Sequence, residues 1–165
     1  MAKSFPFFKQ HDSMDCGATC LRMISSYYGK NFPIEYLRDL TQITREGVSF
    51  ADISEAAEKI GFRSLAVKLS FDQLVQEVPL PCIAHWNQEH FVVIYHVSEN
   101  EIVIGDPAKE ILKLDKKEFL KSWSVEQDNG LYFGILLLLE PSPEFYNQDD
   151  NKENKSNKNI FNYLL

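Results

Sequence analysis

The chain has three cysteines, Cys16, Cys20 and Cys82. Cys16 occupies a position in which its thiol could act as a nucleophile. It stands at the start of a strong helical pattern, between Asp15 and Gly17. The free N–H groups and partial positive charge at a helix N-terminus stabilise a thiolate, the reactive form of cysteine. Asp15 opposes this effect unless its side chain turns to the backbone N–H groups as an N-cap. Taken alone, the position also suits a buried structural cysteine.

A histidine and an aspartate on two successive predicted strands could supply an oriented general base. His90 begins one strand and Asp106 ends the next. A connection centred on Ser98 places them directly opposite, with Cβ atoms about 4.5–5.5 Å apart. A connection centred on Glu99 makes them diagonal neighbours at roughly 7–8 Å, whereas a slip of one residue separates them onto opposite faces. At either of the first two distances, the carboxylate could hold one imidazole nitrogen and fix its tautomer.

A glutamine precedes the cysteine by six residues. The amide of Gln10 could donate to an oxyanion, alongside the backbone N–H of Cys16. A glutamine in a loop before a helix also suits simple solvation, so its role depends on the rest of the set.

Metal binding is the competing chemistry, because Cys16 and Cys20 lie four residues apart and the chain has four histidines. Structural zinc sites use paired Cys-x2-Cys knuckles, and no second knuckle is present. Cys20 also belongs to an apolar helical stripe, so we expect it to pack in the core. The spacing therefore predicts no metal site. An odd number of cysteines without a signal-peptide pattern indicates reduced thiols.

The elements that must position these residues divide the chain into two halves. The first half has helical patterns, and capping and stop residues such as Ser49, Ser70 and Gly29 delimit them. They cover residues 15–28, 34–40, 49–60 and 70–78. The second half alternates as strands do, apart from a short helix at 116–122. The expected strands cover residues 63–69, 82–86, 90–97, 101–106, 110–114 and 131–139. Helices followed by strands predict an α+β domain with a mostly antiparallel sheet.

Composition sets the domain limits and excludes some functions. Residues 1–140 read as one domain, 141–159 as a polar linker, and 160–165 as the start of a following segment. A net charge of −7 gives no electrostatic support for binding nucleic acid. The longest apolar run, Ile135 to Leu139, is far too short for a membrane span. The first residues lack the apolar core of a signal peptide.

Three segments together resemble the C39 peptidase family, the papain-like cysteine peptidases of bacteriocin exporters. The resemblance covers roughly residues 5–140. Its motifs are Gln10 with the segment from Asp15 to Cys20, then His-Trp and His-Phe-Val-Val around His90, then Asp-Pro-Ala at Asp106.

The resemblance implies a papain-like fold and a role for each matching residue. Cys16 would be the nucleophile, His90 the general base, Asp106 the residue that orients it, and Gln10 the oxyanion-hole donor. The implied reaction cleaves the leader from a ribosomally made, secreted peptide after a double-glycine motif. The precursor would bind through an amphipathic helical leader, and the resemblance implies no metal or small cofactor.

The resemblance also implies partners and a location. Transmembrane and ATPase domains of a homodimeric ABC transporter would follow, with this domain on the cytoplasmic side of the bacterial membrane. Two alternatives stay open, a free-standing papain-like peptidase of other specificity and a non-catalytic leader-binding module.

Overall fold

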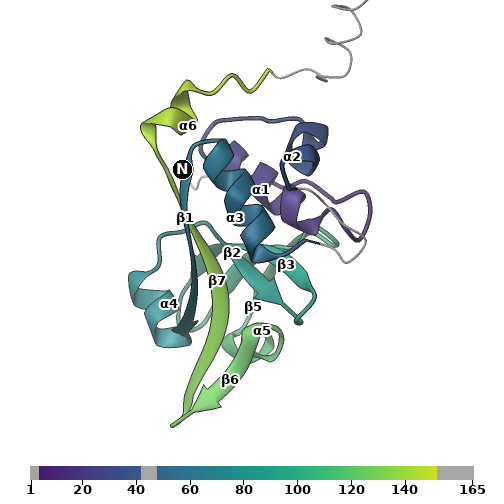
Figure 1. Ribbon diagram of the computed structural model, residues 1–165. Helices are drawn as coiled ribbons and strands as arrows, with labels where there is room; N and C mark the ends of the chain where they lie inside the picture. Colours follow the sequence, from purple (N-terminus) through teal and green to yellow (C-terminus); the bar gives the residue numbers. More distant parts are fainter. Residues whose placement is uncertain (1–3, 42–47, 152–165) are drawn as a thin grey trace, which may run out of the picture.

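The computed structural model describes residues 4–41 and 48–151, and a mixed sheet-and-helix domain fills these ranges (Figure 1). Its helices are α1 (Cys16–Tyr27), α2 (Ile34–Thr41), α3 (Phe50–Lys59), α4 (Phe71–Glu77), α5 (Lys116–Trp123) and α6 (Pro143–Asn147). Its strands are β1 (Phe62–Ser70), β2 (Cys82–Trp86), β3 (His90–Val97), β4 (Ile102–Gly105), β5 (Ile111–Leu114), β6 (Ser124–Asp128) and β7 (Leu131–Pro141).

The strands form one antiparallel sheet in the order β1-β7-β2-β3-β4-β5, and β6 pairs with β7. The first three helices pack on one face of this sheet, and α4 and α5 pack on the other. Alternate strand residues therefore enter two separate cores. In β3, Val93 faces the first core, while Val92 and Ile94 face the second. The predicted α+β class with an antiparallel sheet is confirmed.

Local capping chemistry explains where several helices begin. Ser49 and Ser70 each accept a hydrogen bond from the backbone N–H three residues later, and the side chain at that third position accepts one from the backbone N–H of the serine. Both had been expected as N-caps, and α3 and α4 start directly after them. Asp115 caps α5 in the same way. The predicted strands 82–86 and 90–97 match β2 and β3 residue for residue.

The packed structure continues beyond residue 140, where the composition indicated a change to linker. β7 extends to Pro141, and α6 follows it. Phe145 of α6 is fully buried, with its ring centroid 4.5 Å from that of Phe62. The helix lies against Gly61, where a Cβ would come within 2.3 Å of the Phe145 backbone nitrogen. One aromatic side chain thus holds a polar segment on the domain. The predicted segment 160–165 lies outside the described residues.

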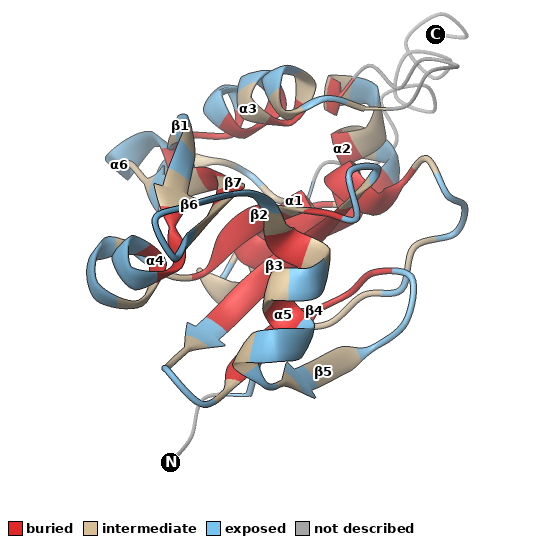
Figure 2. Ribbon diagram, turned by 90° about the horizontal axis from the view of Figure 1, so that it is seen from below, coloured by how far each residue is buried: buried red, intermediate tan, exposed pale blue. Residues whose placement is uncertain are grey.

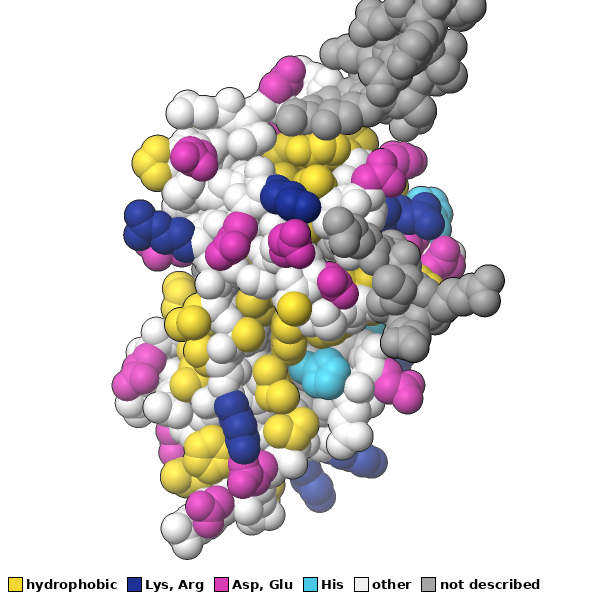
Figure 3. Space-filling model, viewed as in Figure 1, with side chains coloured by type: hydrophobic (Ala, Val, Ile, Leu, Met, Phe, Trp, Pro, Cys, Tyr) yellow, Lys and Arg dark blue, Asp and Glu magenta, His cyan; other side chains and the backbone are white. Residues whose placement is uncertain are grey.

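Burial is concentrated in α1 and the central strands (Figure 2). The helices cover only part of the face on which α1 and α3 pack. Ile135 shares the face of buried Leu137 two residues along β7, but it is only half-buried and belongs to neither core. Figure 3 shows hydrophobic side chains gathered on the sheet below α3.

Within the described ranges, no helix is long and apolar enough to cross a membrane.

Candidate active site

The nucleophile candidate occupies the expected place. Cys16 is the first residue of α1, and it is 5% exposed at the edge of the first core. Gly17 lets α3 pack closely, since a Cβ there would lie 2.8 Å from Cδ1 of Ile53. The neighbour that requires a glycine here is therefore a side chain.

His90 and Asp106 meet as the strand argument required. The imidazole Nε2 lies 2.6 Å from Asp106 Oδ1, and the ring also hydrogen bonds to Cys16. Because Asp106 occupies Nε2, Nδ1 is the nitrogen left for the sulfur. The three side chains thus interact in the order carboxylate, imidazole, thiol, and this set is called the Cys16–His90–Asp106 line.

The electrostatics of this line favour a charged imidazole. Burial of His90 lowers its pKa, but the hydrogen bonds to Asp106 and Cys16 outweigh this and raise the pKa to about 9. Burial also raises the pKa of Asp106, but the bonds from His90 and from the Ala108 N–H outweigh it, so the pKa is lowered overall. At neutral pH the pair is an imidazolium and a carboxylate, and a cation beside a cysteine favours its thiolate form.

A β-bulge at Tyr95 decides that His90 and Asp106 share a face. Near the turn, β3 pairs with β4 in a register where His96 lies opposite Val103. Continued unchanged, that register would place Asp106 opposite Val93, on the wrong face for His90. The bulge shifts the ladder by one residue, so that Val93 lies opposite Gly105. His90 becomes a diagonal neighbour of Asp106, the second of the two arrangements predicted.

The bulged Tyr95 also holds the N-terminal segment. Its hydroxyl donates a hydrogen bond to the Pro6 carbonyl, and its ring stacks on Phe5 at 4.6 Å between centroids. The ring lies against Gly105, where a Cβ would come within 3.0 Å of it. The sequence did not predict the contact of Tyr95 with the N-terminal segment, because this contact depends on a β-bulge that no local sequence pattern indicates.

Gln10 is brought to the same region by its backbone. Its N–H donates to the carbonyl of Pro107, the residue after Asp106, at 2.8 Å. Its side-chain Oε1 is buried without a hydrogen-bond partner among the described residues. The structure therefore places Gln10 beside the Asp106 turn, and the direction of its amide toward an oxyanion stays a prediction.

The other two cysteines pack in the interior. Cys20 is fully buried, its Sγ donates to the Phe91 carbonyl at 3.4 Å, and burial raises its pKa well above the usual value. Burial likewise raises the pKa of Cys82. Both are poor nucleophiles as a result, and core packing of Cys20 is confirmed. Across residues 4–41 and 48–151, no cluster of three or more His, Cys, Asp or Glu side chains could hold a metal.

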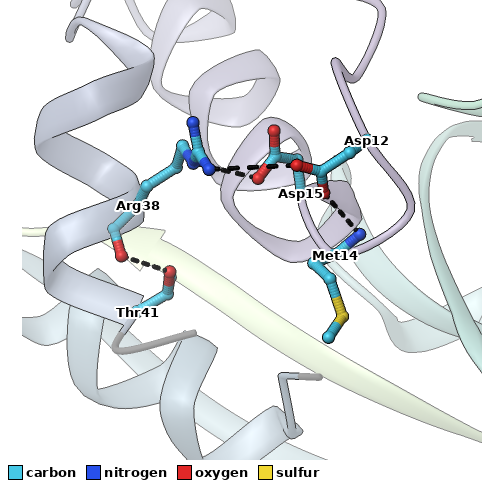
Figure 4. Close-up of polar contacts among 5 residues, drawn as sticks. All are labelled: Asp12, Met14, Asp15, Arg38 and Thr41. Carbon is cyan, nitrogen blue, oxygen red and sulfur yellow. Dashed lines mark hydrogen bonds and ion pairs between the residues drawn. The ribbon is translucent and has the colours of Figure 1, made fainter. Parts of the chain in front are cut away.

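Asp15 does not cap α1, which corrects the alternative considered for it. Its side chain accepts no capping hydrogen bond. The fully buried carboxylate instead forms an ion pair with α2, where Arg38 Nε lies 3.0 Å from Oδ1 (Figure 4). Arg38 was also missed from sequence, because it stands 23 residues later on another helix.

Comparison with protein-family models matches residues 4–127 to the Peptidase C39 family. The chain belongs to the C39 peptidase family. It is therefore a cysteine peptidase domain, and the resemblance drawn from the motifs is confirmed.

Relatives of this C39 domain are much longer proteins. The chain is 32% identical over 143 residues to the colicin V secretion/processing ATP-binding protein CvaB of Escherichia coli. It is 38% identical over 142 residues to the lactococcin-G-processing and transport ATP-binding protein LagD of Lactococcus lactis subsp. lactis. These matches cover 87% and 82% of the chain, but the chain spans about a fifth (19%) of each relative.

Solved structures have the same fold. A double glycine motif protease from an AMS/PCAT transporter, in complex with its leader peptide, matches with a TM-score of 0.74 and 31% identity. The match covers 83% of this chain and 91% of that one. The peptidase domain of Streptococcus ComA matches with a TM-score of 0.72 and 26% identity, over 84% of this chain and 100% of that one.

Proposed function

We propose that this C39 domain cleaves the leader from a ribosomally made peptide precursor after a double-glycine motif. The observation that carries the proposal is the line of Cys16, His90 and Asp106 within a fold shared with a double glycine motif protease. A non-catalytic leader-binding module would have no use for a buried, charged histidine aimed at a thiol. The proposed roles are nucleophile for Cys16, acid and base for His90, and orienting carboxylate for Asp106.

The first half of the reaction forms a thioester. The Cys16 thiolate attacks the carbonyl carbon of the second glycine, and the C=O electrons move onto oxygen. When that oxyanion collapses, the C=O bond reforms and the C–N bond breaks. The leaving amine takes the proton of the His90 imidazolium.

The second half releases the leader. Neutral His90 removes a proton from water, whose oxygen attacks the thioester carbonyl. Collapse of this intermediate expels the Cys16 thiolate and leaves a leader with a free carboxylic acid, which loses its proton to solvent. His90 is again an imidazolium, so the resting ion pair is restored. Asp106 holds Nε2 throughout and stabilises the charged ring, without accepting the proton.

Gln10 is proposed as the side-chain donor to the oxyanion, beside the backbone N–H of Cys16 at the free end of α1. Its backbone bond to Pro107 places it near the Asp106 turn, which supports the role. Loss of one such donor typically costs about 10²–10³ in kcat. Gln10→Ala is expected to fall in that range.

The leader is proposed to dock on the uncovered sheet face around Ile135. This face carries half-buried apolar side chains where the helices end, and an amphipathic helix could cover them. His85 shares this face with buried Ile83, and Phe50 at the start of α3 lies beside it at 5.8 Å between ring centroids. The face thus leads from the sheet toward α3.

The proposed setting is a bacterial exporter, because CvaB and LagD are named as processing and transport ATP-binding proteins. Transmembrane and ATPase domains would then accompany this domain in one homodimeric protein, with the peptidase on the cytoplasmic side of the membrane.

The test is incubation of the reduced domain with a precursor whose leader ends in Gly-Gly, followed by mass spectrometry. Cleavage after the second glycine, absent with Cys16→Ala, is expected. Cleavage elsewhere would favour a papain-like peptidase of other specificity. Binding without cleavage, equal for the domain and Cys16→Ala, would favour a leader-binding module.

A further inference from the structure

A buried ion pair stands directly beside the nucleophile. The Asp15 carboxylate is fully buried, and it belongs to the residue before Cys16. Arg38 Nε lies 3.0 Å from it, while neither carboxylate oxygen receives a hydrogen bond of ordinary geometry within the described part of the chain. An unpaired carboxylate at this point would oppose formation of a thiolate on the adjacent residue.

Arg38 contacts both ends of the turn that leads into α1. Its terminal NH2 nitrogen lies 3.9 Å from Asp12 Oδ2, and Asp12 in turn accepts hydrogen bonds from Met14 N and Asp15 N (Figure 4). The backbone of Arg38 is itself held, because Thr41 Oγ1 donates to its carbonyl at 3.0 Å. The Arg38 side chain is about 41% exposed, and its guanidinium pairs with the carboxylate of the residue that precedes Cys16.

We infer that Arg38 is a positioning residue that neutralises Asp15 and so keeps the Cys16 thiolate accessible at neutral pH. The inference rests on the proposed role of Cys16 as nucleophile. It adds a second cation to the site, with a role different from that of His90. His90 supplies the positive charge that pairs with sulfur, and Arg38 cancels the negative charge that would compete with it.

Several other charged or titratable groups lie on the elements around Cys16. His90 and Asp106 form the pair already described, and Cys20 on the next turn of α1 is fully buried. From α3 the group facing Gly17 is the apolar Ile53. His11, in the loop before α1, is exposed. Arg22, farther along α1, places its guanidinium 3.9 Å from the centroid of the Phe8 ring. Among the residues the structure describes, Arg38 is therefore the cation that forms an ion pair with Asp15.

A charge cycle tests the inference by the pH midpoint of Cys16 alkylation with iodoacetamide, located by mass spectrometry. Arg38→Met should raise the midpoint by about one pH unit, which slows alkylation about tenfold below it. Asp15→Asn should lower the midpoint. The double variant Asp15→Asn with Arg38→Met should return close to the unaltered domain, because both charges are gone.

Two further variants keep the test decisive. Lys59→Met breaks an exposed pair with Glu55 on α3 and should leave the midpoint unchanged. If Arg38→Met does not fold, Arg38→Lys, which keeps the charge, should leave the midpoint unchanged, while Asp15→Asn should still lower it. An unchanged midpoint in Asp15→Asn, and in Arg38→Met where it folds, would overturn the inference and leave a packing role only. Alkylation needs no precursor, so this result stands apart from a failure to find cleavage.

Discussion

His90 reaches Asp106 diagonally, with Nε2 and Oδ1 2.6 Å apart, although the register of β3 and β4 puts Val92 opposite the aspartate. The His90 and Asp106 side chains therefore contact each other diagonally across the two strands.

The charge of His90 predicts the alkaline limit of activity. Its pKa is raised to about 9, so the imidazolium is present below that value and is lost as the pH rises through it. Cleavage should therefore decline near pH 9. Asp106→Asn removes the carboxylate that raises the pKa, so the alkaline limb should move about one unit or more toward lower pH. Initial cleavage rates measured from about pH 6 to about pH 10 locate the alkaline limb. A limb at the same pH in both proteins would contradict the role assigned to Asp106.

The Tyr95 hydroxyl is predicted to act through Gln10. Tyr95 holds Pro6 in the segment that carries Gln10, so Tyr95→Phe should loosen the placement of the amide and lower kcat. In a Gln10→Ala background the same change should have little further effect, because the two residues act on one step. Tyr146→Phe, at an exposed tyrosine on α6, is the matched control. Additive losses in kcat would show that Tyr95 acts independently of Gln10.

The uncovered sheet face is predicted to bind the leader. Ile135→Asp places a charge among the apolar side chains that a leader helix would cover, so KM for a full precursor should rise about tenfold or more. The rate of Cys16 alkylation should stay unchanged, because the substitution does not alter the proposed nucleophile. Val125→Asp, at an exposed position on β6, is the control for added charge. An equal KM for both variants would place the leader elsewhere.

Phe145 is predicted to stabilise the domain from beyond the compositional boundary. Phe145→Ala empties a fully buried site against Phe62 and should lower the free energy of unfolding by about 3–5 kcal/mol. Tyr146→Ala, next along the chain and about half exposed, should cost far less. Urea denaturation of both variants measures the difference. Equal losses would mean that α6 contributes little to stability.

Local chemistry was enough to predict much of the architecture. The caps at Ser49 and Ser70, and the alternation in 82–86 and 90–97, depend on residues close in sequence. Helix caps and strand alternation can therefore be predicted without knowledge of the fold. For the same reason Cys16 was correctly expected at the start of a helix.

Tertiary structure decided what joins distant segments. Whether His90 and Asp106 share a face depends on a single bulge at Tyr95, since a shift of one residue reverses every side chain of a strand. The pairing of Asp15 with Arg38 and the burial of Phe145 likewise arise where separate elements meet. Sequence alone determined the residue types and local elements of this peptidase, because these follow from neighbouring residues. Register, charge pairing and the reach of the core were decided by contacts between residues far apart in the chain.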